Sequence, residues 1–133
     1  MKTLLIEDDP TAVFLTKRLF HHEGIPDELT TFLSPQKGLD FIRAQLAAGL
    51  PPEVILLDLN MPILNGWDVL AALEPLQEHL LGRCLVYILT SSLATTDLAR
   101  AEAHPLVTGF IHKPLKRDEL LAIQTQVQES HLN

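Results

Sequence analysis

The stretch Ile55-Leu56-Leu57-Asp58-Leu59-Asn60-Met61-Pro62 decides the fold of this chain. From Val54 to Leu57 the residues are apolar without alternation, which predicts a strand that is covered on both faces, as in a parallel sheet. Such a strand needs neighbouring strands on both sides and helices over both faces. The rest of the chain supplies both.

Four other short apolar runs, bounded by Asp, Pro, Gly or Ser, also predict strands. They are Thr3–Glu7, Leu29–Leu33, Leu85–Leu89 and Gly109–His112. Amphipathic patterns between the runs predict helices from Pro10 to Gly24, from Pro35 to Gly49, from Gly66 to Pro75, over Thr95–Ala103 and over Lys116–Glu129. Five repeats of strand then helix predict an α/β fold, with a parallel sheet, right-handed crossovers and helices on both faces.

The apolar faces of two expected helices differ. In the first expected helix, Ala12, Leu15 and Leu19 share one face at helical spacing, with Val13 and Phe20 nearby. The fourth, over Thr95–Ala103, has only Leu98 and alanines on its apolar face, so its packing is expected to be the weakest.

The chain has 133 residues, of which 47% are hydrophobic and 20% charged. This length and apolar content predict one compact domain over residues 1–133, with its core from about 2 to 130. Only Ser130–Asn133 follow the last expected helix, so we expect no output domain.

Charge and cysteine content exclude several classes of function. The 10 basic and 17 acidic side chains give a net charge of −7, which disfavours binding to nucleic acid. No apolar stretch is long enough to cross a bilayer, and the N-terminus lacks a signal-peptide apolar region. One cysteine, Cys84, excludes an internal disulfide and a cysteine-based zinc site. We therefore expect a cytoplasmic protein with no membrane partner.

Residues capable of chemistry end four of the five expected strands: Glu7-Asp8, Asp58, Thr90 and Lys113. Because the carboxyl ends of parallel strands lie at one edge of a sheet, we expect these side chains to converge. Clustered carboxylates repel one another unless a cation such as Mg²⁺ neutralises them. An ammonium and a hydroxyl beside them would contact phosphoryl oxygens, and a carboxylate in line could act as the nucleophile.

Four motifs carry a resemblance to a known family. They are Leu4-Leu5-Ile6-Glu7-Asp8-Asp9-Pro10, Ile55–Pro62 followed by Gly66, Ile88-Leu89-Thr90-Ser91, and Ile111-His112-Lys113-Pro114. In this order and at this spacing the chain resembles the receiver domain of two-component response regulators, the CheY-like family, from Lys2 to about Ser130. The resemblance implies a flavodoxin-like doubly wound sheet of five strands in the order 2-1-3-4-5. It also implies transfer of a phosphoryl group from a sensor histidine kinase, or a histidine phosphotransfer protein, to an aspartate.

The same resemblance implies a metal site and an acceptor. Asp58 looks like the phosphoacceptor and a ligand of Mg²⁺, with Mn²⁺ as a possible substitute. Asp8 would bind the metal directly, Glu7 would hold metal-bound water, and Asn60 would offer its backbone carbonyl. Asp9, just before Pro10, is better interpreted as a helix cap than as a metal ligand.

The remaining roles implied by the resemblance concern the phosphoryl group and the response to it. Thr90 and Lys113 would grip the phosphoryl oxygens, and Lys113-Pro114 would be a cis peptide. Thr90 and Phe110 would act as the switch, although Phe110 lacks the hydroxyl of the tyrosine often found there. Phosphorylation would then change a protein-binding surface made by the fourth helix, the fifth strand and the fifth helix.

Two other classes of function stay open. A phosphorylation-independent adaptor of receiver type would need no chemistry at Asp58. A magnesium-dependent phosphohydrolase with an aspartyl nucleophile would want Asp-x-Asp after the first strand, where the chain has Glu7-Asp8-Asp9. We expect a signalling domain rather than an enzyme, either a monomer or a homodimer that forms on phosphorylation. The six histidines lack metal-ligand spacing, and we expect them at the surface or at its boundary with the core. Trp67 and Cys84 are expected to be packing residues.

Overall fold

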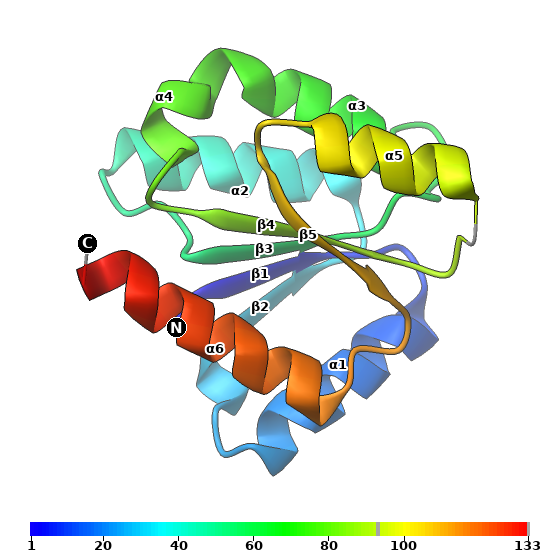
Figure 1. The fold of residues 1–133 in the computed structure, drawn as a ribbon, viewed down its shortest axis with the longest axis vertical. Coiled ribbons are helices and arrows are strands. Elements are labelled where there is room, and N and C mark those ends of the chain that lie inside the picture. The colour runs from blue at the N-terminus through cyan, green and yellow to red at the C-terminus, as the bar shows by residue number, and fades with distance from the viewer. Residues whose placement is uncertain (93, 133) are drawn as a thin grey trace.

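The computed structural model describes residues 1–92 and 94–132, the last two by their backbone alone. Within these residues, five parallel strands form one sheet in the order β2-β1-β3-β4-β5 (Figure 1). The strands are β1 (Thr3–Ile6), β2 (Leu29–Phe32), β3 (Val54–Leu57), β4 (Leu85–Thr90) and β5 (Val107–His112). The predicted fold class and strand order are therefore confirmed.

Helices cover both faces of this sheet (Figure 1). On one face lie α2 (Pro35–Ala47), α3 (Gly66–Leu73), α4 (Gln77–Leu80) and α5 (Thr95–Ala103). On the other face lie α1 (Pro10–His22) and α6 (Arg117–Leu132). Two short 3₁₀ helices, η1 (Pro26–Glu28) and η2 (Glu74–Leu76), complete the described elements.

The central strands divide the core into two apolar layers. All four residues of β1 and all four of β3 are buried, as a strand covered on both faces requires. Since successive side chains point to opposite faces, Ile55 and Leu57 pack toward α2 and α3, whereas Val54 and Leu56 pack toward α1 and α6. β3 thus holds Asp58 rigidly at its end.

The predicted helix starts are confirmed by side-chain caps. The Asp9 carboxylate accepts a hydrogen bond of 3.0 Å from the Thr11 N–H at the start of α1, and the Ser34 hydroxyl caps α2. At α3, Asn65 and Asp68 form a capping box, each side chain accepting from the other's N–H at 2.9 Å.

The buried face of α1 contains Val13 and Phe20, which were expected near its apolar face, but not Leu15. The side chains of α1 that are buried are Val13, Thr16 and Phe20, whereas Leu15 is 43% exposed. A shift of one residue turns a helix by about 100°, and both faces carry apolar side chains. Thr16 can occupy the core because its hydroxyl donates to the Ala12 carbonyl at 3.0 Å within the same helix.

One helix was not predicted. Pro75 ends α3 as expected, but the chain continues into η2 and the single turn α4 instead of a loop. Leu80, at the end of α4, is fully buried and anchors this turn to the core. The fourth and fifth expected helices are therefore α5 and α6.

Gly66 allows α3 to begin directly against the end of β3. A Cβ at this position would lie 2.4 Å from the Asp58 carbonyl oxygen and 2.8 Å from Leu59 Cα, which are backbone atoms. We expect Gly66→Ala to lower the free energy of unfolding by about 2 kcal/mol, because backbone must move to relieve the overlap. Urea denaturation measures the effect.

Gly38→Ala is the matched control for that substitution. Its Cβ would meet atoms of the Ile6 side chain at 2.8 Å, and a side chain yields more cheaply than backbone. A loss for Gly66→Ala no larger than the loss for Gly38→Ala would contradict the close approach.

Candidate functional site

Three carboxylates meet at the carboxyl edge of the sheet. Glu7 and Asp8 follow β1, and Asp58 follows the neighbouring strand β3. One ligand oxygen from each lies within 4.8 Å of the other two. Among the described residues, Glu7, Asp8 and Asp58 form the one group of acidic side chains that are close enough together to share a metal ion.

Burial makes this cluster electrostatically costly. Glu7 is 1% exposed and Asp58 is 2% exposed, while Asp8 is partly exposed. Burial, followed by the hydrogen bond and charge of Asp58, raises the pKa of Glu7 from 4.5 to about 8. Without a bound cation, the positive charge near Glu7 is therefore too small to offset the effect of burial and of Asp58 on its pKa.

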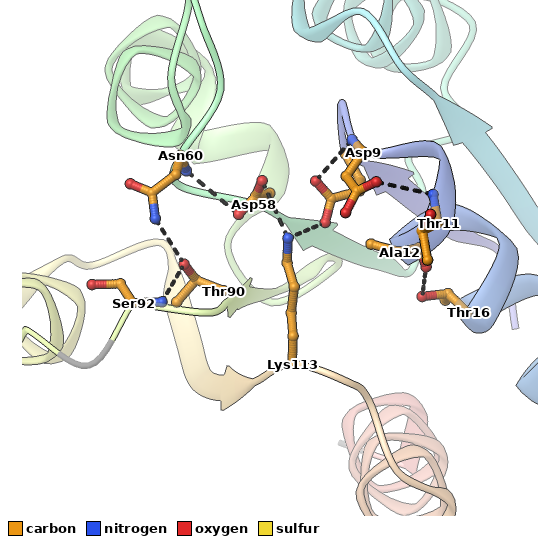
Figure 2. Close-up of polar contacts among 10 residues, drawn as sticks. Asp9, Thr11, Ala12, Thr16, Asp58, Asn60, Thr90, Ser92 and Lys113 are labelled. Carbon is orange, nitrogen blue, oxygen red and sulfur yellow. Dashed lines mark hydrogen bonds and ion pairs between the residues drawn. The ribbon is translucent and has the colours of Figure 1, made fainter.

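Lys113 brings an ammonium group to the cluster from the end of β5. Its Nζ lies 3.4 Å from Asp58 Oδ2 and forms an ion pair with Glu7 Oε1 (Figure 2). Burial alone would lower the pKa of Lys113, but Glu7 and Asp58 outweigh that effect and raise the pKa. The Lys113-Pro114 peptide is cis, as the resemblance implied.

The donor set fits a hard divalent cation. Three carboxylates face one ammonium, and oxygen ligands with charge in excess are what Mg²⁺ binds. Glu7, Asp8 and Asp58 have the required chemistry and spacing. The contribution of the Asn60 carbonyl stays a prediction.

Thr90 ends β4, between the strands that carry Asp58 and Lys113. Its hydroxyl oxygen accepts hydrogen bonds from Asn60 Nδ2 at 3.4 Å and from the Ser92 N–H at 3.2 Å (Figure 2). The Asn60 N–H in turn donates to Asp58 Oδ1 at 3.4 Å. With both bonds accepted, the Thr90 hydroxyl proton is available as a donor.

The side chains of three other residues considered in the sequence take no part in this polar cluster. Phe110, in β5, is half-buried against the core layer that contains α3. Asp9 caps α1, as predicted, and its N–H donates to Glu7 Oε2 at 3.3 Å. Cys84 is buried, which raises the pKa of its thiol to about 12, so it is a packing residue.

The sequence reasoning missed two contacts. The Ser92 hydroxyl donates to Asp97 on α5 at 2.8 Å. The sequence offered one indication of this contact, a serine five positions before an acid in the first turn of an expected helix. His104 lies at the boundary of the core, as expected, but its two ring-nitrogen hydrogen bonds were not foreseen. The side chain of His131 lies outside the described residues.

Residues 3–125 match the response regulator receiver domain. The chain belongs to this family. It is a family of signalling domains from two-component systems, which confirms the resemblance drawn from the four motifs.

Curated relatives are also response regulators. The chain is 28% identical to the probable methanogenesis regulatory protein FilR2 of Methanothrix harundinacea over 127 residues, which cover 95% of the chain and 80% of FilR2. It is 31% identical to the nitrate/nitrite response regulator NarL of Escherichia coli over 120 residues, 89% of the chain and 50% of NarL. The chain therefore matches about half the length of NarL.

Solved receiver structures share the fold. A two-component response regulator from Cytophaga hutchinsonii has a TM-score of 0.84 at 29% identity, covering 96% of both chains. A response regulator receiver protein from Dyadobacter fermentans has a TM-score of 0.82 at 28% identity, covering 95% of this chain and 96% of its own.

None of the helices in residues 1–92 and 94–132 combines the length and apolar character needed to cross a membrane.

The raised pKa of Glu7 predicts a pH-dependent stability in the absence of divalent cations. Between pH 4.5 and about 8 the folded state holds a proton on Glu7 that the unfolded state has lost. The free energy of unfolding should therefore fall as the pH rises through this window. Urea denaturation in chelator at several pH values measures the slope, and Glu7→Gln should flatten it.

Mg²⁺ should oppose this trend, because metal binding requires ionised carboxylates and stabilises the folded state. The stabilisation by Mg²⁺ should be larger at pH 8 than at pH 6. Glu102→Gln, at an exposed position on α5, is the control and should keep the wild-type slope. Equal slopes for wild type and Glu7→Gln would contradict the assignment.

Backbone strain lies in the loop that follows Asp58. Ile63 has φ 69° and a fully exposed side chain. A β-branched residue is costly in this conformation, whereas glycine is not. We expect Ile63→Gly to raise the free energy of unfolding by about 1 kcal/mol in urea denaturation.

Ile63→Ala separates strain from the loss of an exposed apolar side chain. Alanine keeps a Cβ, so the backbone stays strained and little stability should be gained. Equal gains for the two variants would show that the side chain, not φ, is responsible.

Proposed function

We propose that this chain is a single-domain response regulator, in which Asp58 accepts a phosphoryl group in a Mg²⁺-dependent reaction. The donor would be a histidine of a sensor kinase or of a histidine phosphotransfer protein. The observation that carries the proposal is the surroundings of Asp58. Its buried carboxylate has oxygen atoms of two further carboxylates within 4.8 Å, and the Lys113 ammonium lies 3.4 Å from its Oδ2.

The acceptor step uses groups already in place. Glu7, Asp8, Asp58 and the Asn60 carbonyl would hold Mg²⁺, or Mn²⁺, which when bound neutralises carboxylate and phosphoryl oxygens. An Asp58 oxygen forms the new bond to phosphorus as the bond from phosphorus to the donor's imidazole nitrogen breaks, and that nitrogen keeps the electron pair.

Lys113 and Thr90 would stabilise the transferred group. The Lys113 ammonium contacts Asp58 directly, and the Thr90 hydroxyl, on the neighbouring strand, is linked to Asp58 through Asn60. Both would donate to phosphoryl oxygens, where charge accumulates during the transfer. These two residues would thus accelerate the domain's own phosphorylation and dephosphorylation, its one chemical activity.

The output would be a change in protein binding. A phosphoryl group adds negative charge and acceptor oxygens, which would draw the Thr90 hydroxyl toward Asp58. The half-buried Phe110 would follow into the space that Thr90 leaves. The surface formed by α5, β5 and α6 would then shift between two states that a target protein distinguishes.

Two alternatives fit the site less well. A phosphohydrolase with a second acid two residues along from its nucleophile is disfavoured, because Asp9 is engaged as the cap of α1. An adaptor that works without phosphorylation would have no use for the Lys113 and Thr90 contacts around Asp58. The proposal also assigns residues 1–133 to one receiver unit. It acts in the cytoplasm as a monomer or as a phosphorylation-induced homodimer, without binding nucleic acid or membrane.

Phosphorylation of Asp58 is tested by mass spectrometry of the intact protein. With Mg²⁺ and acetyl phosphate we expect the mass of one phosphoryl group to be added, with acetate as the leaving group. Asp58→Asn should abolish the gain, and Asp40→Asn, at an exposed position on α2, should retain it. A gain that persists in Asp58→Asn would reject Asp58 as the acceptor.

The metal role of Asp8 is tested in the same reaction. Asp8→Ala removes one of three carboxylates, so the Mg²⁺ concentration for half-maximal phosphorylation should rise about tenfold or more. An unchanged Mg²⁺ requirement would show that Asp8 is not a ligand.

A further inference from the structure

The helix α5 has little apolar packing of its own. Among its residues, Ala101 is the buried one, and Leu98 is 40% exposed. A helix held by so little apolar surface depends on contacts made by side chains near its ends.

One contact joins the start of α5 to the phosphorylation site. Asp97, in the first turn, accepts a hydrogen bond of 2.8 Å from the Ser92 hydroxyl. The Ser92 N–H donates to the Thr90 hydroxyl oxygen at 3.2 Å (Figure 2). Two hydrogen bonds therefore connect Thr90, beside Asp58, with α5.

Two further contacts hold the other end of α5 to α3 and η2. The Arg100 guanidinium lies over the Trp67 ring, 4.2 Å from its centroid. His104, which follows the last residue of α5, bonds Glu74 through Nε2 at 3.1 Å. Its Nδ1 accepts from the Leu106 N–H at 3.1 Å, so Nε2 carries the proton and donates to the Glu74 carboxylate. We call these two contacts, Trp67–Arg100 and Glu74–His104, the clamp.

The spacing of the clamp matches two helices lying side by side. Arg100 and His104 are four residues apart, so their side chains project from the same face at the C-terminal end of α5. Trp67 and Glu74 are seven residues apart, two turns along α3 and into η2. Figure 1 shows α5 next to α3 over the same face of the sheet. The clamp thus fixes the position of α5 along α3.

We propose that the clamp holds α5 in its resting position and thereby limits how tightly the Asp58 site takes a phosphoryl group. This inference rests on the proposed function and adds its regulation. A phosphoryl oxygen attracts the Thr90 hydroxyl, and the Ser92–Asp97 bond passes that displacement to α5. Displacement of α5 breaks the clamp contacts, so the free energy of breaking them reduces the net free energy with which a phosphoryl group binds at Asp58. By linkage, a weaker clamp means tighter binding at Asp58.

The test measures the affinity for beryllium fluoride, a non-covalent phosphoryl mimic, with Mg²⁺ in titration calorimetry. Arg100→Gln and His104→Ala should each bind about two- to fivefold more tightly than wild type, the range for one exposed cation–π or charged contact. Arg83→Gln and Glu102→Ala, at exposed positions outside the clamp, should bind as wild type does. Unchanged or weaker binding by both clamp variants overturns the proposal.

A second variant distinguishes coupling from general loosening. Ser92→Ala removes the bond to Asp97, so in that background Arg100→Gln should no longer change the affinity. The gain persisting in the double variant would show that the clamp acts by another route, and would also overturn the proposal. Failure of every protein, wild type included, to bind beryllium fluoride rejects the proposed function instead.

The clamp itself has an independent readout. Trp67 is the single tryptophan of the chain, so its fluorescence reports the Arg100 contact directly. Beryllium fluoride should shift wild-type emission toward that of unligated Arg100→Gln. Amide hydrogen exchange over α5 should be faster in Arg100→Gln than in Arg83→Gln, and equal exchange rates would show that the clamp does not hold the helix.

Discussion

The attraction between one ammonium group and a buried cluster of carboxylates is the interaction on which the rest of the site depends. Lys113 reaches Glu7 and Asp58 at positions that are nearly inaccessible to water, where uncompensated negative charge is most costly. The fully buried strands β1 and β3 supply the rigidity that keeps like charges together. The buried carboxylates therefore lower the local stability, and a divalent cation would compensate their excess negative charge. A phosphoryl group on Asp58, as proposed, would in turn change the balance of charge at this edge of the sheet.

Much of this arrangement was predictable, because its determinants are local. The run Val54–Leu57 has no alternation, so it had to be an inner strand, and β3 has those bounds. Asp9 and Ser34 precede prolines at helix starts, and both act as caps. Once the strands were parallel, their carboxyl ends had to share an edge, which brought Glu7, Asp58 and Lys113 together from distant parts of the chain. A single topological rule thus replaced any need for long-range information.

The failures share the opposite property, since each depends on partners that periodicity does not identify. On α1, Leu15 is exposed and Thr16 is buried, because a hydroxyl that bonds its own helix can enter the core and both faces carry apolar residues. The turn α4 is anchored by Leu80, which is fully buried in the core layer that contains α2 and α3, and the sequence around Pro75 does not indicate that contact. The contact of Arg100 with Trp67 joins two surface positions of different helices, and nothing in either helix alone indicates the other. Contacts between side chains of different elements could not be predicted from the sequence pattern of either element.

The helix with the weakest sequence pattern, α5, is also the one to which we assign the transmission of the signal, and both features have one cause. With Ala101 as its buried side chain, α5 adds little apolar area to the core, which weakens its sequence pattern and lowers the cost of moving it. A helix without a defined resting position could not transmit a signal, however, because a ligand shifts a population only between states for which its affinity differs. Polar and cation–π contacts at both ends give α5 a defined resting place at a cost small enough for one phosphoryl group to overcome. A helix with several fully buried side chains would need more free energy to displace, because each of them adds apolar area that would have to leave its packing.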